Sequence, residues 1–209
     1  MIGVINYRTG NSQSVVYALE HLGLTGRLVS GPQDADDVDR FILPGVGSAE
    51  VTMASLRDSG WVDYLGERVR DQGMPFLGIC VGLQVLFEFS DEGSVDCLGW
   101  LPGKVEEFDR TRVRVPHIGW NEVRPVGEHP FARAIGEGGH FYFVNSFHAV
   151  PARPGIAAGI ASYDDDFTAV VARDNIMATQ FHVEKSGPLG LRLLAWFATT
   201  EKDDFLAHE

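Results

Sequence analysis

The chain has 209 residues, of which 44% are hydrophobic and 22% are charged, a composition typical of a soluble globular protein and not of a disordered one. Its formal net charge of −12 repels a phosphate backbone, so we expect no nucleic-acid partner. Two cysteines, Cys80 and Cys97, are too few for a disulfide framework, so we expect a reduced, cytoplasmic protein. The sequence contains no apolar run of about 18 residues, so we expect no membrane span.

The first half of the chain alternates strand-like and helix-like patterns. Ser12 is expected to cap the first helix, and Gly23 to end it. Short buried strands are predicted at 2–5, 27–29, 41–43 and 75–79, and helices at 12–22, 51–58, 62–71 and 81–87. This alternation predicts an α/β fold with a largely parallel central sheet flanked by helices.

The second half of the chain reads differently. Short extended pieces surround Val105, Val113, Val115, Trp120 and Val123. A strand is predicted at 140–145, a hairpin at 169–173 and 176–181, a last helix at 189–199, and a frayed polar tail at 201–209. These patterns predict additional short antiparallel strands, and we expect residues 1–209 to form one domain.

A glycine-flanked cysteine follows the strand at 75–79. The segment Gly78-Ile79-Cys80-Val81-Gly82 has the form of a nucleophile elbow, in which small residues let a sharp strand-to-helix turn pass close to itself. The helix N-terminus would favour the thiolate, and the Val81 N–H would point to a developing oxyanion. An ordinary buried cysteine explains this segment alone about equally well.

A histidine and a carboxylate come two residues apart near the end of the chain. In an extended segment, His182 and Glu184 would face the same side. The carboxylate could then orient the imidazole and stabilise its protonated form, as in a catalytic triad. An exposed polar pair is the alternative for such a motif by itself, but the cysteine elbow favours the catalytic interpretation.

A second glycine-rich turn follows the strand at 41–43. If that strand lies beside the one carrying Cys80, Val46 and Gly47 form the second side of an oxyanion hole. An ordinary strand-to-helix turn is the alternative. The remaining histidines are scattered without ligand spacing, so no metal site is predicted; they are His21, His117, His129, His140 and His148.

Taken together, the motifs resemble those of the glutaminase subunits of imidazole glycerol phosphate synthases, which are class I glutamine amidotransferases. The resemblance covers nearly the whole chain, and its most specific part is the segment 116–121. It is carried by residues 43–47, 77–84, 115–121, 142–146 and 179–186.

The resemblance implies a triad of Cys80, His182 and Glu184 that hydrolyses glutamine through a thioester. It implies a glutamine site formed by Gln84, Glu92, Asn145, Ser146 and Phe147. It further implies a heterodimer with a barrel-shaped cyclase subunit, which receives the ammonia for histidine biosynthesis. The surface facing this partner, or the ammonia path, would include Arg8, Asn11 and Lys185. No cofactor is required.

Several positions depart from the pattern of these glutaminases: the loop start at 6–8, which includes Arg8, and Asn145, Phe147 and Val183. None of them removes a triad atom, but Arg8 adds a charge to a loop expected near the partner. The alternatives are therefore a glutaminase for a different synthase, in surface-sugar amidation or specialised metabolism, and a cysteine hydrolase or peptidase of similar fold. A binding protein without catalysis is a further alternative.

Overall fold

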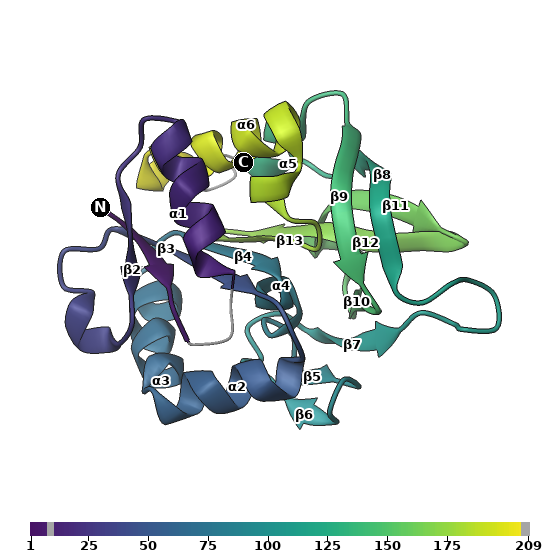
Figure 1. Ribbon diagram of the computed structural model, residues 1–209, viewed down its shortest axis with the longest axis horizontal. Coiled ribbons are helices and arrows are strands. Elements are labelled where there is room, and N and C mark those ends of the chain that lie inside the picture. The colour runs from purple at the N-terminus through teal and green to yellow at the C-terminus, as the bar shows by residue number, and fades with distance from the viewer. Residues whose placement is uncertain (8–10, 206–209) are drawn as a thin grey trace.

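A computed structural model describes residues 1–7 and 11–205 of the chain (Figure 1). Its centre is a sheet whose first five strands run parallel in the order β2-β1-β3-β4-β13. These strands span Ile2–Ile5 (β1), Gly26–Val29 (β2), Arg40–Gly45 (β3), Phe76–Cys80 (β4) and Ile176–Thr179 (β13). All residues of β1, β4 and β13 are buried, as strands covered on both faces must be.

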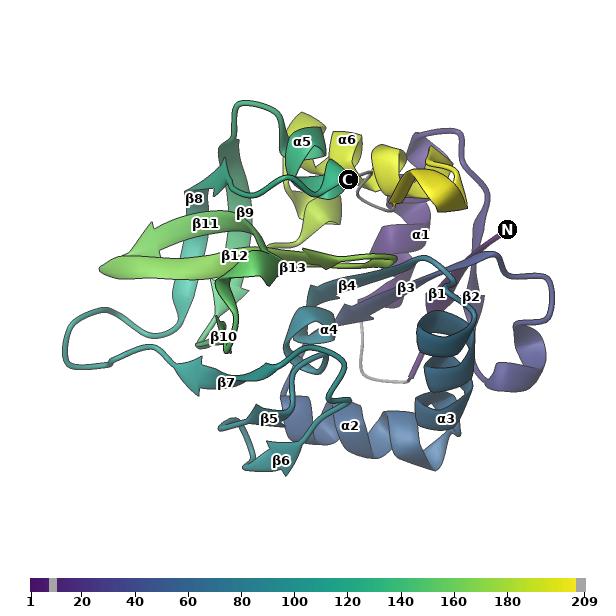
Figure 2. The same cartoon turned by 180° about the vertical axis from the view of Figure 1, so that it is seen from behind.

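Helices cover both faces of this parallel region. Figures 1 and 2 show α1 and α6 on one face and α2 and α3 on the other. The helices span Ser12–His21 (α1), Ala49–Asp58 (α2), Trp61–Leu65 (α3), Val81–Gln84 (α4), Pro130–Ile135 (α5) and Gly187–Thr199 (α6). A π-helical turn, Gly66–Asp71, continues α3, and short 3₁₀ turns lie at Pro32–Asp34, Pro154–Ile156, Val183–Lys185 and Lys202–Phe205.

Further strands extend the sheet beyond β13, and all their pairings are antiparallel except that of β5 with β7. The order continues β12-β10-β7-β5-β6. A branch leaves this path at β12: β11 pairs with β12, β8 pairs with β11, and β9 pairs with β8. These strands span Phe89–Ser90 (β5), Val95–Asp96 (β6), Gly103–Glu107 (β7), His117–Pro125 (β8), Gly139–Asn145 (β9), Phe147–Pro151 (β10), Ala157–Tyr163 (β11) and Asp165–Arg173 (β12). The predicted parallel sheet with antiparallel additions in the second half is therefore confirmed.

Three local predictions were wrong. The helix expected over 81–87 ends at Gln84, and Val85 closes a turn instead. Ser12 begins α1 and does not cap it, because its Oγ donates a hydrogen bond of 2.9 Å to the Ile5 carbonyl; Asn11 is the N-cap residue. The tail is not frayed as far as residue 205, since Phe205 is fully buried against Trp196.

None of the helices within the described ranges is long and apolar enough to cross a membrane.

Candidate active site

Cys80 lies at a sharp turn between β4 and α4. Its φ of 57° and ψ of −107° place a non-glycine residue in a strained conformation, which persists only where the surroundings enforce it. The glycines around it allow the turn. A Cβ at Gly78 would lie 2.3 Å from the Gly82 carbonyl oxygen, and one at Gly82 would lie 2.0 Å from the Leu43 carbonyl oxygen. This geometry is that of a nucleophile elbow and not of an ordinary strand end.

His182 and Glu184 form a buried pair directly after β13. The Nδ1 atom of His182 lies 2.9 Å from Oε1 of Glu184, and their side chains are 2% and 1% exposed. Glu184 stands in the 3₁₀ turn Val183–Lys185, so the pairing comes from that turn. The expected extended segment was wrong, although the two side chains do meet.

Ser186 holds the backbone of His182 in place. Its hydroxyl donates a hydrogen bond of 2.6 Å to the His182 carbonyl and accepts one of 3.0 Å from the Tyr142 N–H. The His182 N–H in turn donates to the Tyr142 carbonyl over 3.0 Å. His182 is thereby tied to Tyr142 of β9 directly through its N–H, and through the Ser186 hydroxyl on its carbonyl side.

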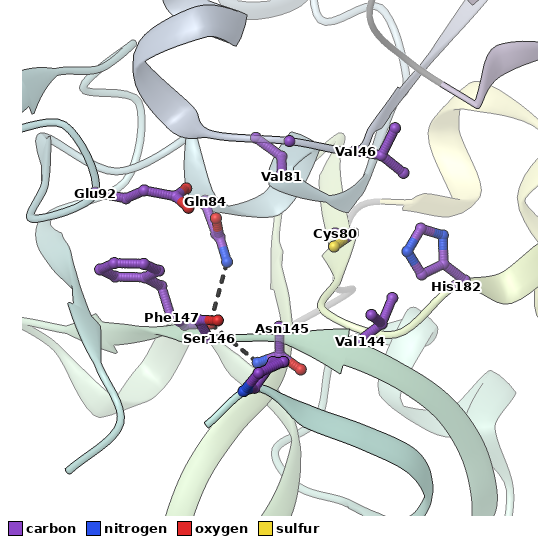
Figure 3. Close-up of a pocket in the computed structure, with 12 residues that line it drawn as sticks. Val46, Cys80, Val81, Gln84, Glu92, Val144, Asn145, Ser146, Phe147 and His182 are labelled. Atoms are coloured by element: carbon purple, nitrogen blue, oxygen red, sulfur yellow. Dashed lines mark hydrogen bonds between the residues drawn. The ribbon is translucent and has the colours of Figure 1, made fainter. Parts of the chain in front are cut away.

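The imidazole of His182 faces the sulfur of Cys80 (Figure 3). Burial lowers the pKa of His182, but the interactions with Cys80 and Glu184 outweigh it and raise that pKa to about 9. Its Nε2 has no conventional hydrogen-bond partner among the described residues, so this nitrogen is available to the sulfur and to a ligand. At neutral pH the ring therefore carries a proton beside the sulfur.

A cavity of about 320 Å³ opens over the sulfur, large enough for a small metabolite. Ten predicted site residues line it: Val46, Gly47, Cys80, Val81, Gln84, Glu92, Asn145, Ser146, Phe147 and His182. Two lining residues were not predicted, Pro116 and Val144. Glu184 stands behind His182 and does not reach the cavity wall. Six separate parts of the chain thus converge on one space.

Amide groups frame the end of the cavity away from His182. The Nε2 of Gln84 and the Nδ2 of Asn145 both donate to the Phe147 carbonyl, over 3.1 and 3.0 Å (Figure 3). Glu92 accepts a hydrogen bond of 2.9 Å from the Ala49 N–H, and burial raises the pKa of its carboxyl group. Oδ1 of Asn145 is buried without a partner in the described part of the chain. These groups can bind the polar ends of an amino-acid ligand.

The predicted oxyanion-hole residues directly follow two adjacent strands, β3 and β4. β3 pairs with β4 in parallel, with Gly45 opposite Cys80, so the Val46–Gly47 turn stands beside the nucleophile. Gly47 has a φ of +105°, which favours glycine, and Val81 is the first residue of α4. Amides at such a helix start have no partner within the helix, so Val81 can donate to a ligand.

Sequence reasoning missed Gln180, a completely buried residue next to the nucleophile. Its Nε2 lies 3.6 Å from Cys80 Sγ and its Oε1 accepts a hydrogen bond of 3.2 Å from Gln84. The available signal was a polar side chain directly after the apolar strand β13, two residues before His182.

The predicted partner-facing residues do not line the cavity. Arg8 lies outside the described residues. Asn11 precedes α1, where its Oδ1 accepts a hydrogen bond of 2.6 Å from Ser14. Lys185 is exposed and ends the turn that contains Glu184.

Comparison with known proteins places this site in a family context. The model of the glutamine amidotransferase class-I family matches residues 3–199. The imidazole glycerol phosphate synthase subunit HisH 2 of Pseudomonas aeruginosa is 41% identical, over 94% of this chain and 98% of its own length. Subunit HisH of Nitrosococcus oceani is 43% identical, over 95% of this chain and 96% of its own.

Solved structures show the same fold at lower identity. A crystal structure of a glutamine amidotransferase superposes with a TM-score of 0.71 at 22% identity, covering 94% of this chain and 96% of that one. The structure of PurLQS from Thermotoga maritima gives a TM-score of 0.72 at 18% identity, covering 94% and 96%. At these identities the likeness concerns the fold alone.

Proposed function

The chain belongs to the glutamine amidotransferase class-I family, and from that premise we propose that it is the glutaminase subunit of an imidazole glycerol phosphate synthase. One observation carries the chemical part of the proposal. A strained cysteine and a histidine face one cavity, and a buried carboxylate stands behind the histidine, although the cysteine stands about a hundred residues before the other two.

The first half of the proposed reaction forms a thioester. The sulfur of Cys80 attacks the side-chain amide carbon of glutamine, and the carbonyl electrons move to oxygen. His182 gives its proton to the departing nitrogen, while Glu184 holds the ring in the productive orientation. The tetrahedral intermediate then collapses, the carbon–nitrogen bond breaks, and ammonia leaves.

The second half returns the enzyme to its resting state. Neutral His182 takes a proton from water, and the hydroxide adds to the thioester carbonyl. The carbon–sulfur bond breaks, the electron pair returns to Cys80, and glutamate leaves. In both halves the oxyanion would be bound by the Val81 N–H and by the Val46–Gly47 turn, at about 3 kcal/mol for each donor.

We propose Gln84, Glu92 and residues 145–147 as the glutamine-binding groups. The cavity presents the carboxylate of Glu92 and the free Oδ1 of Asn145, which suit an α-amino group. Gln84 is already oriented by the Phe147 carbonyl. The amide carbon of a bound glutamine would then lie between this end of the cavity and Cys80.

An exposed apolar surface supports a protein partner next to the cavity. On the paired strands β8 and β9, Ile118 is 62% exposed, Trp120 56% and Val144 37%, and Ile118 stands opposite Val144. Val144 also lines the cavity. Large exposed apolar side chains grouped in this way mark interaction sites. We propose that this surface, together with Asn11 and Lys185, binds a barrel-shaped cyclase subunit that receives the ammonia.

The test uses the complex with its co-purified partner. In Cys80→Ala, glutamine-dependent synthase activity is expected to disappear, while activity driven by added ammonium salt is retained. Glutamine hydrolysis by the variant would contradict the mechanism. Capture of a different synthase, with no turnover of the imidazole glycerol phosphate precursor, would contradict the assigned partner but not the glutaminase chemistry.

A further inference from the structure

The amide of Gln180 makes a contact that the triad mechanism does not use. Its Nε2 is positioned to donate a hydrogen bond to Cys80 Sγ at 3.6 Å. The side chain is fully buried, and its other end accepts from Gln84. Gln84 is itself anchored to the Phe147 carbonyl over 3.1 Å. The donor at the sulfur is therefore held by a chain of hydrogen bonds that ends on the backbone of β10.

We infer that Gln180 is a further catalytic residue, whose amide N–H stabilises negative charge on Cys80 Sγ in the resting enzyme and when the thioester breaks. The inference rests on the proposed function, because it assigns a role within that glutaminase reaction. Gln180 and His182 both follow β13 within three positions of the chain, so one segment supplies both groups that stabilise a thiolate.

Charge balance places the effect of this donor at two steps. When the sulfur is a thiolate, a hydrogen bond from a neutral N–H to this charged acceptor is stronger than one between neutral groups. During attack the charge moves from sulfur to the carbonyl oxygen, and the bond weakens. During thioester hydrolysis the carbon–sulfur bond breaks, the electron pair returns to sulfur, and the same N–H stabilises it.

Two substitutions separate the two ends of the amide. Gln180→Glu keeps the shape and an oxygen for Gln84, but places an acceptor against the sulfur. Gln180→Met keeps the length and removes the donor. The ionisable groups around the sulfur are His182, paired with Glu184, and Glu92 across the cavity, and both variants retain them. Thr179→Val is the matched control. Thr179 is the buried residue directly before Gln180, but its hydroxyl donates to the Phe181 carbonyl and not to the sulfur.

The direct measurement is the rate of Cys80 alkylation by iodoacetamide as a function of pH, in full-length protein. A Cys97→Ser background makes residue 80 the only thiol, since the chain has two cysteines. Loss of one hydrogen bond to a charged group predicts about tenfold slower alkylation near pH 7 in Gln180→Met, and a larger reduction in Gln180→Glu, whose acceptor also repels the thiolate. Their profiles should shift to higher pH and converge with the parent at alkaline pH. The Thr179→Val profile should match the parent.

Steady-state kinetics of the partner complex give the second readout. Gln180→Glu keeps the Gln84 contact, so kcat for glutamine hydrolysis should fall about tenfold with little change in KM. Alkylation profiles that coincide with the parent in the folded variants would overturn the inference. If both variants fail to fold, the NMR resonances of the Gln180 side-chain amide protons are followed against pH in the parent protein. These resonances should shift over the same pH range in which the alkylation rate changes. Resonances that do not change with pH would overturn the inference. A parent complex that does not hydrolyse glutamine would instead overturn the proposed function.

Discussion

The two walls of the active site are held in place by different physical means. On the β3–β4–α4 wall, backbone segments pack together with no room for a side chain. A Cβ atom at Gly78 or Gly82 would lie closer to a backbone carbonyl oxygen than van der Waals contact allows. On the β9–β13 wall, His182 accepts a hydrogen bond from Ser186 and donates to the Tyr142 carbonyl and to Glu184. Cys80 is positioned by steric exclusion and His182 by directional hydrogen bonds.

This difference has a consequence for mutation. Where two backbone segments are in direct contact, a substitution cannot weaken the packing gradually, because any added side-chain atom must displace a strand. Hydrogen bonds can be removed one at a time, each at a modest cost. We therefore expect all-or-none effects on the first wall and graded effects on the second.

The largest effect is expected from Gly82→Ala. The new Cβ would stand 2.0 Å from the Leu43 carbonyl oxygen, so β3 and α4 must separate, at a cost of more than about 3 kcal/mol. Glutamine hydrolysis should be lost as well. The control is Gly66→Ala, a helical position where a Cβ meets nothing within 4 Å; it should stabilise the protein by up to about 1 kcal/mol. Urea unfolding measures both, and equal stabilities would refute steric positioning of the nucleophile.

On the second wall, the largest effect is expected from Glu184→Gln. The amide keeps the shape of the carboxylate but cannot support a protonated ring, and its NH₂ can select the wrong tautomer of His182. We expect kcat to fall about 10³- to 10⁴-fold with KM nearly unchanged. The matched control is Glu88→Gln, whose carboxylate accepts from the Gly103 N–H on an exposed loop. Wild-type turnover by the Glu184 variant would remove the carboxylate from the mechanism.

The pH dependence of stability isolates the charge on the second wall. The pKa of His182 is raised to about 9 in the folded protein, against about 6.5 in an unfolded chain. Because the folded pKa is the higher one, the contribution is complete below about pH 6.5 and is lost as the pH rises through about 9. The stability difference between wild type and His182→Gln should therefore shrink by about 3 kcal/mol over this window. A difference that is constant or grows with pH would show that the folded protein holds a neutral ring.

A smaller, graded effect is expected from Ser186→Ala. The hydroxyl is buried and satisfies both the His182 carbonyl and the Tyr142 N–H. Its removal should cost about 2 kcal/mol of unfolding free energy and reduce kcat several-fold while the fold is kept. Thr199→Ala removes a comparable hydroxyl-to-carbonyl bond at an exposed position on α6 and should cost less than about 0.5 kcal/mol. Complete unfolding of the Ser186 variant would contradict the graded behaviour of this wall.

The same contrast explains what could be predicted from the sequence. Steric demands are visible in residue types, so Gly78, Cys80 and Gly82 indicate the elbow from the sequence alone. The parallel strands are equally visible, because strands buried on both faces are continuous apolar runs. The second wall was predicted less well. His182 and Glu184 were paired correctly, but the turn that joins them was taken for an extended segment.

Contacts between distant segments were not predictable in this way. Gln180 reaches Cys80 across 100 positions of the chain, and no local pattern encodes that meeting. Phe205 is buried by aromatic side chains of α6, although its neighbours are charged and the segment reads as a frayed tail. The helix after Cys80 ends at Gln84, where tertiary packing overrides an apolar pattern that continues to Phe87.

The central claim is that the sulfur of Cys80 bonds to the side-chain carbon of glutamine. Acid quenching of the partner complex during turnover, followed by peptide mass spectrometry, tests it directly. The account predicts one γ-glutamyl group on the peptide that carries Cys80, released by hydroxylamine and absent in Cys80→Ala. Steady glutamine turnover with no such adduct, or with the adduct on the Cys97 peptide, would contradict it.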